Sequence, residues 1–280
     1  MTRNVRNGLT AVMAESLTQR HVADAFSKRR CDATSGARML LDVQVNGAPM
    51  GSEVTSSGPI RICVDVEGTA PIERIDFFRG VDCIHSQTLA PSDPDRLRLV
   101  WGGARERGTA GAQRQFWDGT LQVSGARISD VRPVGLQSPD DRIVSDEQGF
   151  RFRTATAGND MGCTFTVEAT VKATVETAIA ATTDTTFRIE TEPASFDASL
   201  SQIRAKTLVV EAGGLERRLE LGPAPTADSS CLATDSSHSG QAKFEDTSHS
   251  AAKHAYWVRI IQTDRHRAWS SPVYVTVSDE

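Results

Sequence analysis

The stretch YWVRIIQTDRHRAWSSPVYVTV, residues 256–277, is either a catalytic strip or the closing hairpin of a β domain. Its apolar residues recur at every second position in two runs, which are Tyr256, Val258 and Ile260, then Val273, Val275 and Val277. Successive side chains of a strand point to opposite faces, so this alternation predicts strands at about 255–263 and 272–278. The charged residues Asp264, Arg265 and His266 fall between the runs, where we expect a solvated turn.

The same alternation extends over much of the chain. It predicts strands at 38–45, 60–66, 72–79, 96–101, 163–175, 185–191, 206–212 and 216–222. One helix is expected near 16–30, with Ser16 or Thr18 as its N-cap. Residues 80–96 are interpreted as a loop, and the Gly-rich 102–115 as a long loop or a bent hairpin. The polar stretch 223–254 is interpreted as a surface loop or a partly disordered segment.

This pattern predicts a mainly β protein, built as one large sandwich or two joined ones, with one short N-terminal helix. Residues 256–277 are interpreted as the last hairpin of an immunoglobulin-like sandwich.

Composition restricts the partners. The formal net charge is −5 and the basic residues are scattered, which argues against nucleic acid or an anionic membrane as partner. No apolar run reaches the roughly 20 residues that span a bilayer, and the N-terminus has no signal-peptide pattern. The five cysteines form no C-x-x-C pair, which favours free thiols and a reducing, cytoplasmic compartment.

Metal and nucleophile chemistry have little support in the sequence. No two of the six histidines are one, three or four residues apart, so we expect no metal site; His238, His249, His254 and His266 would be the first to test. Ser270 and Ser271 lack the G-x-S-x-G turn of a serine nucleophile. They are expected to satisfy backbone groups instead.

The most polar candidate surface lies around the Gly-rich stretch 102–115. Arg105 and Arg107 could face an anion from this loop, and Trp101, Trp117 and Asp118 frame it. Tryptophans on a β-sandwich can stack on sugars, although most are core or loop anchors. Exposed, coplanar indole rings would favour sugar binding, and buried rings would exclude it.

Several stretches together carry a family resemblance. They are GLTAVMAESLTQRHVADAFSKRRCDATSGARMLLDVQVNGAPMG (8–51), WGGARERG (101–108), QFWDGTLQVSGARI (115–128), TATAGNDMG (154–162) and YWVRIIQTDRHRAWSSPVYV (256–275). With these motifs the chain resembles the C-terminal region of a bacterial family of uncharacterised proteins related to PHP (polymerase and histidinol phosphatase) metallohydrolases. Asp32 departs from the pattern, because the family usually has an aromatic residue there.

The resemblance implies that residues 8–51 include the last helix and strand of a PHP-like domain. It also implies that the last hairpin pairs with strands within 38–79, because the β-domain of the family begins and ends in that way. The expected segments are then a remnant helix and linker at 1–38, an immunoglobulin-like β-sandwich at 39–100 and 255–280, and a second, inserted β-unit at 101–254. The His and carboxylate clusters of that domain lie upstream in the family and are not in this chain. It therefore implies a non-catalytic β region that packs on a hydrolase domain, in cis or in trans, and shapes its active site. No cofactor is expected in this chain, and a divalent metal only in the missing domain. The alternatives are a stand-alone carbohydrate- or surface-binding β-sandwich, and an enzyme completed by another chain.

Overall fold

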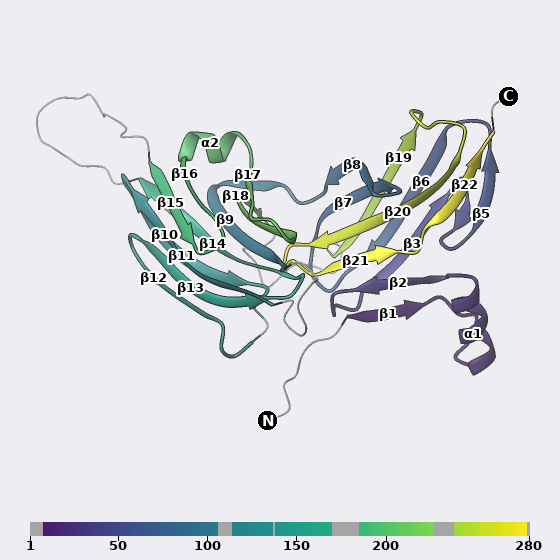
Figure 1. The fold of residues 1–280 in the computed structure, drawn as a ribbon, viewed down its shortest axis with the longest axis horizontal. Helices are drawn as coiled ribbons and strands as arrows, with labels where there is room; N and C mark the ends of the chain where they lie inside the picture. Colours follow the sequence, from purple (N-terminus) through teal and green to yellow (C-terminus); the bar gives the residue numbers. More distant parts are fainter. Residues whose placement is uncertain (1–7, 106–113, 137, 170–184, 227–237, 279–280) are drawn as a thin grey trace, which may run out of the picture. The chain divides into compact units, whose positions relative to one another are not determined.

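The chain folds into two compact units, one of which interrupts the sequence of the other. The computed structural model describes residues 8–105, 114–136, 138–169, 185–226 and 238–278. Unit 1 comprises Met1–Pro91 and Ala227–Glu280, and unit 2 comprises Ser92–Thr226 (Figure 1).

Unit 1 contains two sheets within its described residues. The larger sheet has eight strands in the order β1-β2-β21-β20-β22-β5, with β7 on β20 and β8 on β7. These strands are β1 (Leu9–Val12), β2 (Cys31–Thr34), β21 (Arg267–Ser270), β20 (Lys253–Gln262), β22 (Val273–Val277), β5 (Glu53–Ser56), β7 (Ile72–Arg79) and β8 (Asp82–Thr88). The smaller sheet contains β19 (Ser239–Asp246), β6 (Ile60–Glu67), β3 (Leu40–Val45) and β4 (Ala48–Pro49), in that order.

The two sheets of unit 1 enclose a single hydrophobic core. Strand β6 shows how the alternation builds it, because Ile60, Ile62, Val64 and Val66 are buried while the residues between them are more exposed. Val258 and Ile260 of β20 contribute from the other sheet. The aliphatic side chains of both layers are thereby removed from water, which is the main favourable term in folding.

The closing stretch forms three short strands, and its pairing with the early strands is confirmed. β20 runs antiparallel to β7, with Trp257 opposite Phe78, and β21 folds back on β20. β22 then pairs with the other end of β20. One buried polar cluster stabilises this region: the Tyr256 hydroxyl donates to Asp246 at 2.8 Å, and Arg79 pairs with the same carboxylate at 2.8 Å.

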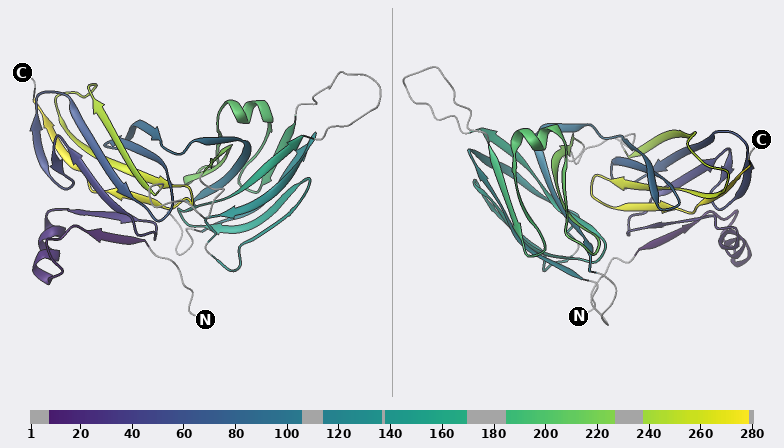
Figure 2. Two further views of the ribbon diagram at one scale, coloured as in Figure 1. Left: turned by 180° about the vertical axis from the view of Figure 1, so that it is seen from behind. Right: turned by 45° about the horizontal axis from the view of Figure 1, so that its top comes forward.

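The described residues of unit 2 also form two sheets around one core (Figure 2). The first sheet contains β12 (Arg142–Asp146), β13 (Gly149–Thr156), β10 (Gln115–Ser124), β15 (Thr186–Thr191) and β16 (Ser195–Ser199), in that order. The second contains β11 (Ala126–Val134), β14 (Asp160–Ala169), β9 (Ser92–Ala104), β18 (Leu215–Pro225) and β17 (Leu208–Glu211).

Three predicted loops contain strands, and the unit boundaries differ from the predicted ones as a result. Residues 80–96 hold β8 and the start of β9, so unit 2 begins at Ser92 rather than at 101. The predicted loop 102–115 begins inside β9. The predicted polar loop 223–254 includes β19, which pairs with β6 and belongs to unit 1.

Two helices occur in the described residues. In α1 (Gln19–Ser27), Thr18 is the N-cap and its side chain accepts from the His21 amide at 3.3 Å, as one of the two predicted caps. The second helix, α2 (Leu200–Ala205), has a Ser199–Gln202 capping box and was not predicted. With nine and six residues, neither is long enough to cross a bilayer.

Candidate functional site

The two tryptophans expected to frame a binding surface are core residues of unit 2. Trp101 and Trp117 are both 0% exposed. The Trp101 indole donates to the Thr154 hydroxyl at 2.7 Å, and the Trp117 indole donates to the Thr156 hydroxyl at 2.9 Å. Trp101 also stacks on Phe152 with a centroid distance of 4.0 Å. With both faces enclosed, these rings cannot stack on a sugar, so the predicted aromatic platform is wrong.

The polar residues of the same predicted surface lie apart from these rings. β10 places Trp117 inward and Asp118 outward, opposite Arg153 on β13. Arg105 is exposed directly after β9, and Arg107 lies outside the described residues. The strand period explains the separation, because adjacent residues of a strand face opposite sides of its sheet.

The turn expected to be solvated is instead packed into unit 1. Arg265 is 5% exposed, has a positive φ of 71° and lies 3.5 Å from the Glu73 carboxylate. His266 shares a 3.0 Å hydrogen bond with the Ser35 hydroxyl. Ser270 has the predicted structural role, since its hydroxyl accepts from the Val258 amide at 3.0 Å.

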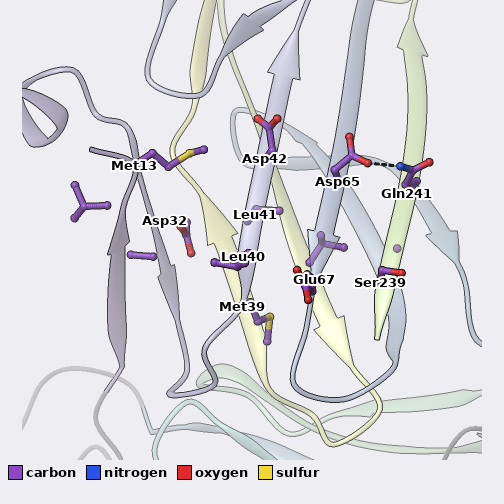
Figure 3. Close-up of a pocket in the computed structure, with 14 residues that line it drawn as sticks. Met13, Asp32, Met39, Leu40, Leu41, Asp42, Asp65, Glu67, Ser239 and Gln241 are labelled. Atoms are coloured by element: carbon purple, nitrogen blue, oxygen red, sulfur yellow. Dashed lines mark hydrogen bonds between the residues drawn. The ribbon is translucent and has the colours of Figure 1, made fainter. Parts of the chain in front are cut away.

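A groove on unit 1 is the most site-like feature of the described chain. It has a volume of about 760 Å³ and lies between the paired strands β1 and β2 and the ends of β3, β6 and β19 (Figure 3). Four carboxylates line it, those of Asp32, Asp42, Asp65 and Glu67, together with apolar atoms of β1 and β3. None of the described residues that line it is a Lys, Arg or His. We call it the acidic groove.

Asp32 is the most unusual residue of the acidic groove. β2 lies between β1 and β21, with Asp32 in register with Ala11 on one side and Ser270 on the other. The side chain is only 4% exposed, and its Oδ2 atom has no hydrogen-bond partner. Burial penalises the charged form and raises the pKa of Asp32 to about 6, although its own backbone amide partly opposes the shift.

The other carboxylates sit at the mouth of the groove. Asp42 and Asp65 are directly opposite each other across β3 and β6, an arrangement of like charges that destabilises a sheet. Amides rather than cations contact them. Gln241 donates to Asp65 at 2.5 Å (Figure 3), and Gln44 donates to Asp42 at 3.1 Å.

The acids are too dispersed to act as one metal centre. Across the described ranges, no three His, Cys, Asp or Glu residues come together in a group able to hold a metal ion. What the groove offers is negative potential beside apolar surface. Sequence reasoning missed it because the residues that line it come from β1, β2, β3, β6 and β19, which lie far apart in the chain.

Comparison with known proteins finds relatives over a short segment. Uncharacterised proteins of Chlamydia trachomatis and Chlamydia muridarum are each 33% identical over 85 residues, which is 28% of this chain and 14% of each relative. A Chlamydia pneumoniae protein is 31% identical over a segment of the same length. The match therefore spans about one seventh of these much longer relatives. No family model matches the chain, and no solved structure resembles it significantly.

Proposed function

We propose that this chain is a non-catalytic β region of a PHP-like metal-dependent hydrolase relative. In this proposal it packs on a hydrolase domain outside this chain and shapes the active site there. We further propose that unit 1 is the immunoglobulin-like sandwich and that unit 2 is an insertion in it. The length of the Chlamydia relatives supports a chain that works beside other domains.

The observation that carries the proposal is a pair of exposed apolar side chains, one just before α1 and one within it. Leu17, just before α1, is 98% exposed, and Phe26 within α1 is 50% exposed. Only Ala25 of the helix is buried. Each of these side chains leaves apolar area in water that a docked domain would cover. The family resemblance includes this segment as the end of the hydrolase domain.

Unit 1 holds this surface in a defined position. Arg29, directly after the helical segment, donates to the Gly51 carbonyl at 3.0 Å and pairs with Glu53 at 3.1 Å. The Met13 amide also donates to the Arg30 carbonyl at 2.9 Å. A nine-residue helix is marginal by itself in water, so these contacts, together with burial of Ala25, keep it folded.

The test has two parts. The purified chain is assayed for bound metal by elemental analysis and for phosphoesterase activity with added manganese or zinc. We expect no stoichiometric metal and no turnover. Tightly bound ions together with activity in the chain alone would overturn the proposal.

In the second part, a PHP-like domain from a longer family member is mixed with this chain, and complex formation is followed by light scattering. We expect a 1:1 complex that Leu17→Ser and Phe26→Ser weaken. Val144→Ser is the matched control, because Val144 is 68% exposed on β12 of unit 2. A complex equally sensitive to the control, or no complex, would count against docking through α1.

A further inference from the structure

Burial of the Asp32 carboxylate costs free energy of folding, and no hydrogen bond to its Oδ2 atom offsets that cost in the described residues. A buried carboxylate normally has a cation or several hydrogen-bond donors, because leaving it without them costs several kcal/mol. Here Oδ2 has no donor although the side chain is 4% exposed and lines the acidic groove. Uncompensated polar groups of this kind are concentrated at functional sites, where a ligand completes them.

A second unfavourable interaction, independent of Asp32, is the repulsion between two carboxylates at the groove mouth. Asp42 and Asp65 oppose each other in register, and each receives an amide rather than a positive charge. A cation placed between them would turn this repulsion into attraction. The groove thus has two places where positive charge is missing, one inner and one outer.

The arrangement favours an organic cation over a metal ion. Metals such as Ca²⁺ require six or more oxygen ligands around one point, whereas these carboxylates do not cluster. Between the inner and outer acids lies apolar surface. Leu40 is 68% exposed, and Met13 is 44% exposed (Figure 3). Charges separated by apolar surface match a chain of ammonium groups separated by methylenes.

We propose that the acidic groove binds a linear aliphatic polyamine, with one ammonium group on Asp32 and a second between Asp42 and Asp65. The methylenes between them lie against Leu40. Access to Asp32 requires side chains at the mouth to move, and Met13 is suited to this because it is unbranched and flexible. The groove is distinct from the Leu17 and Phe26 surface, so either can fail without the other.

The experiment is calorimetric titration of the full chain with spermidine near pH 7.5 and physiological salt. We expect saturable 1:1 binding. Asp32→Asn removes the charge with little change in shape and should weaken binding by about tenfold or more, as expected for a hydrogen bond to a charged group. Asp65→Asn should weaken it less, because Asp65 is exposed. Asp118→Asn, which removes an exposed carboxylate from unit 2, should leave binding unchanged.

Several results would overturn the proposal. Equal binding of magnesium chloride, or equal weakening by Asp118→Asn, would mean that spermidine only responds to the net negative charge. Undiminished binding by a folded Asp32→Asn variant would remove Asp32 from the site. Saturable binding of oligolysine without binding of spermidine would assign the groove to a basic protein segment instead.

Discussion

Replacing Asp32 with Asn should stabilise the protein, and by an amount that depends on pH. Asp32 has a folded-state pKa of about 6 against an ordinary value of 3.8. At about 1.4 kcal/mol per pKa unit, the ionised side chain lowers the free energy of unfolding by about 3 kcal/mol above pH 6. Asn cannot ionise, so Asp32→Asn removes this penalty.

The sign follows from proton binding. Between pH 4 and pH 6 the folded state holds a proton on Asp32 that the unfolded state has released, so stability falls as pH rises through this window. The stability difference between Asp32→Asn and the natural chain should therefore be about 3 kcal/mol at pH 8 and largely disappear at pH 4. Any fixed cost of burying the amide adds equally at both pH values.

The assay is urea unfolding of both proteins at pH 4, 5, 6, 7 and 8, followed by circular dichroism. Asp32 lies in unit 1, so the effect of the variant should appear in the transition of that unit. Hydrogen exchange of the β2 and β21 amides localises it. A difference in stability that does not change with pH would refute the argument, since it would show that Asp32 is not a buried, uncompensated carboxylate.

Three further outcomes are expected. Tyr256→Phe should lower the free energy of unfolding by about 1–3 kcal/mol, because Asp246 loses a buried donor; an unchanged urea midpoint would contradict this. Cys163, whose pKa burial raises to about 12, should react with a thiol reagent far more slowly than exposed Cys83, and equal rates in the folded protein would contradict its burial. Gly103→Ala should lower the free energy of unfolding of unit 2 by more than about 1 kcal/mol. A Cβ at this position would lie 2.4 Å from the backbone nitrogen of Arg217, and the φ of Gly103 is +90°. An unchanged melting temperature would contradict this.

Strands with one buried face could be predicted from the sequence. β6 alternates between buried and more exposed residues over its whole length, and the hairpin of β17 and β18 turns at Gly213–Gly214 as expected. Strand β19 was missed because its inward positions include Gly240 and Ala242, which are small and carry a weak apolar signal. Its place is decided by pairing with β6.

Contacts between distant parts of the chain also explain why the predictions for unit 2 and for the site were wrong. Gly102 and Gly103 suggested a loop, but both lie inside β9. Glycine is needed there because neighbouring segments leave no room for a side chain. A Cβ at Gly102 would meet the Asp160 carboxylate at 2.1 Å. Asp32 lies before the first predicted strand, and only the structure reveals that it is buried in β2 with an unpartnered Oδ2 atom. Local pattern predicts strands, whereas long-range pairing decides which polar residues are unusual.

The interruption of unit 1 by unit 2 also dictates an order of events during synthesis. All strands of unit 2 lie within Ser92–Thr226, so this unit is complete before β19 and β20 leave the ribosome. Until then, β6 and β7 lack those partners, and their edges and apolar faces are available for wrong pairing. Early folding of unit 2 shortens the effective loop that β6 and β19 must close, which lowers the entropic barrier to finishing unit 1. A destabilising mutation within unit 2 is therefore expected to reduce the amount of correctly folded unit 1 in cells.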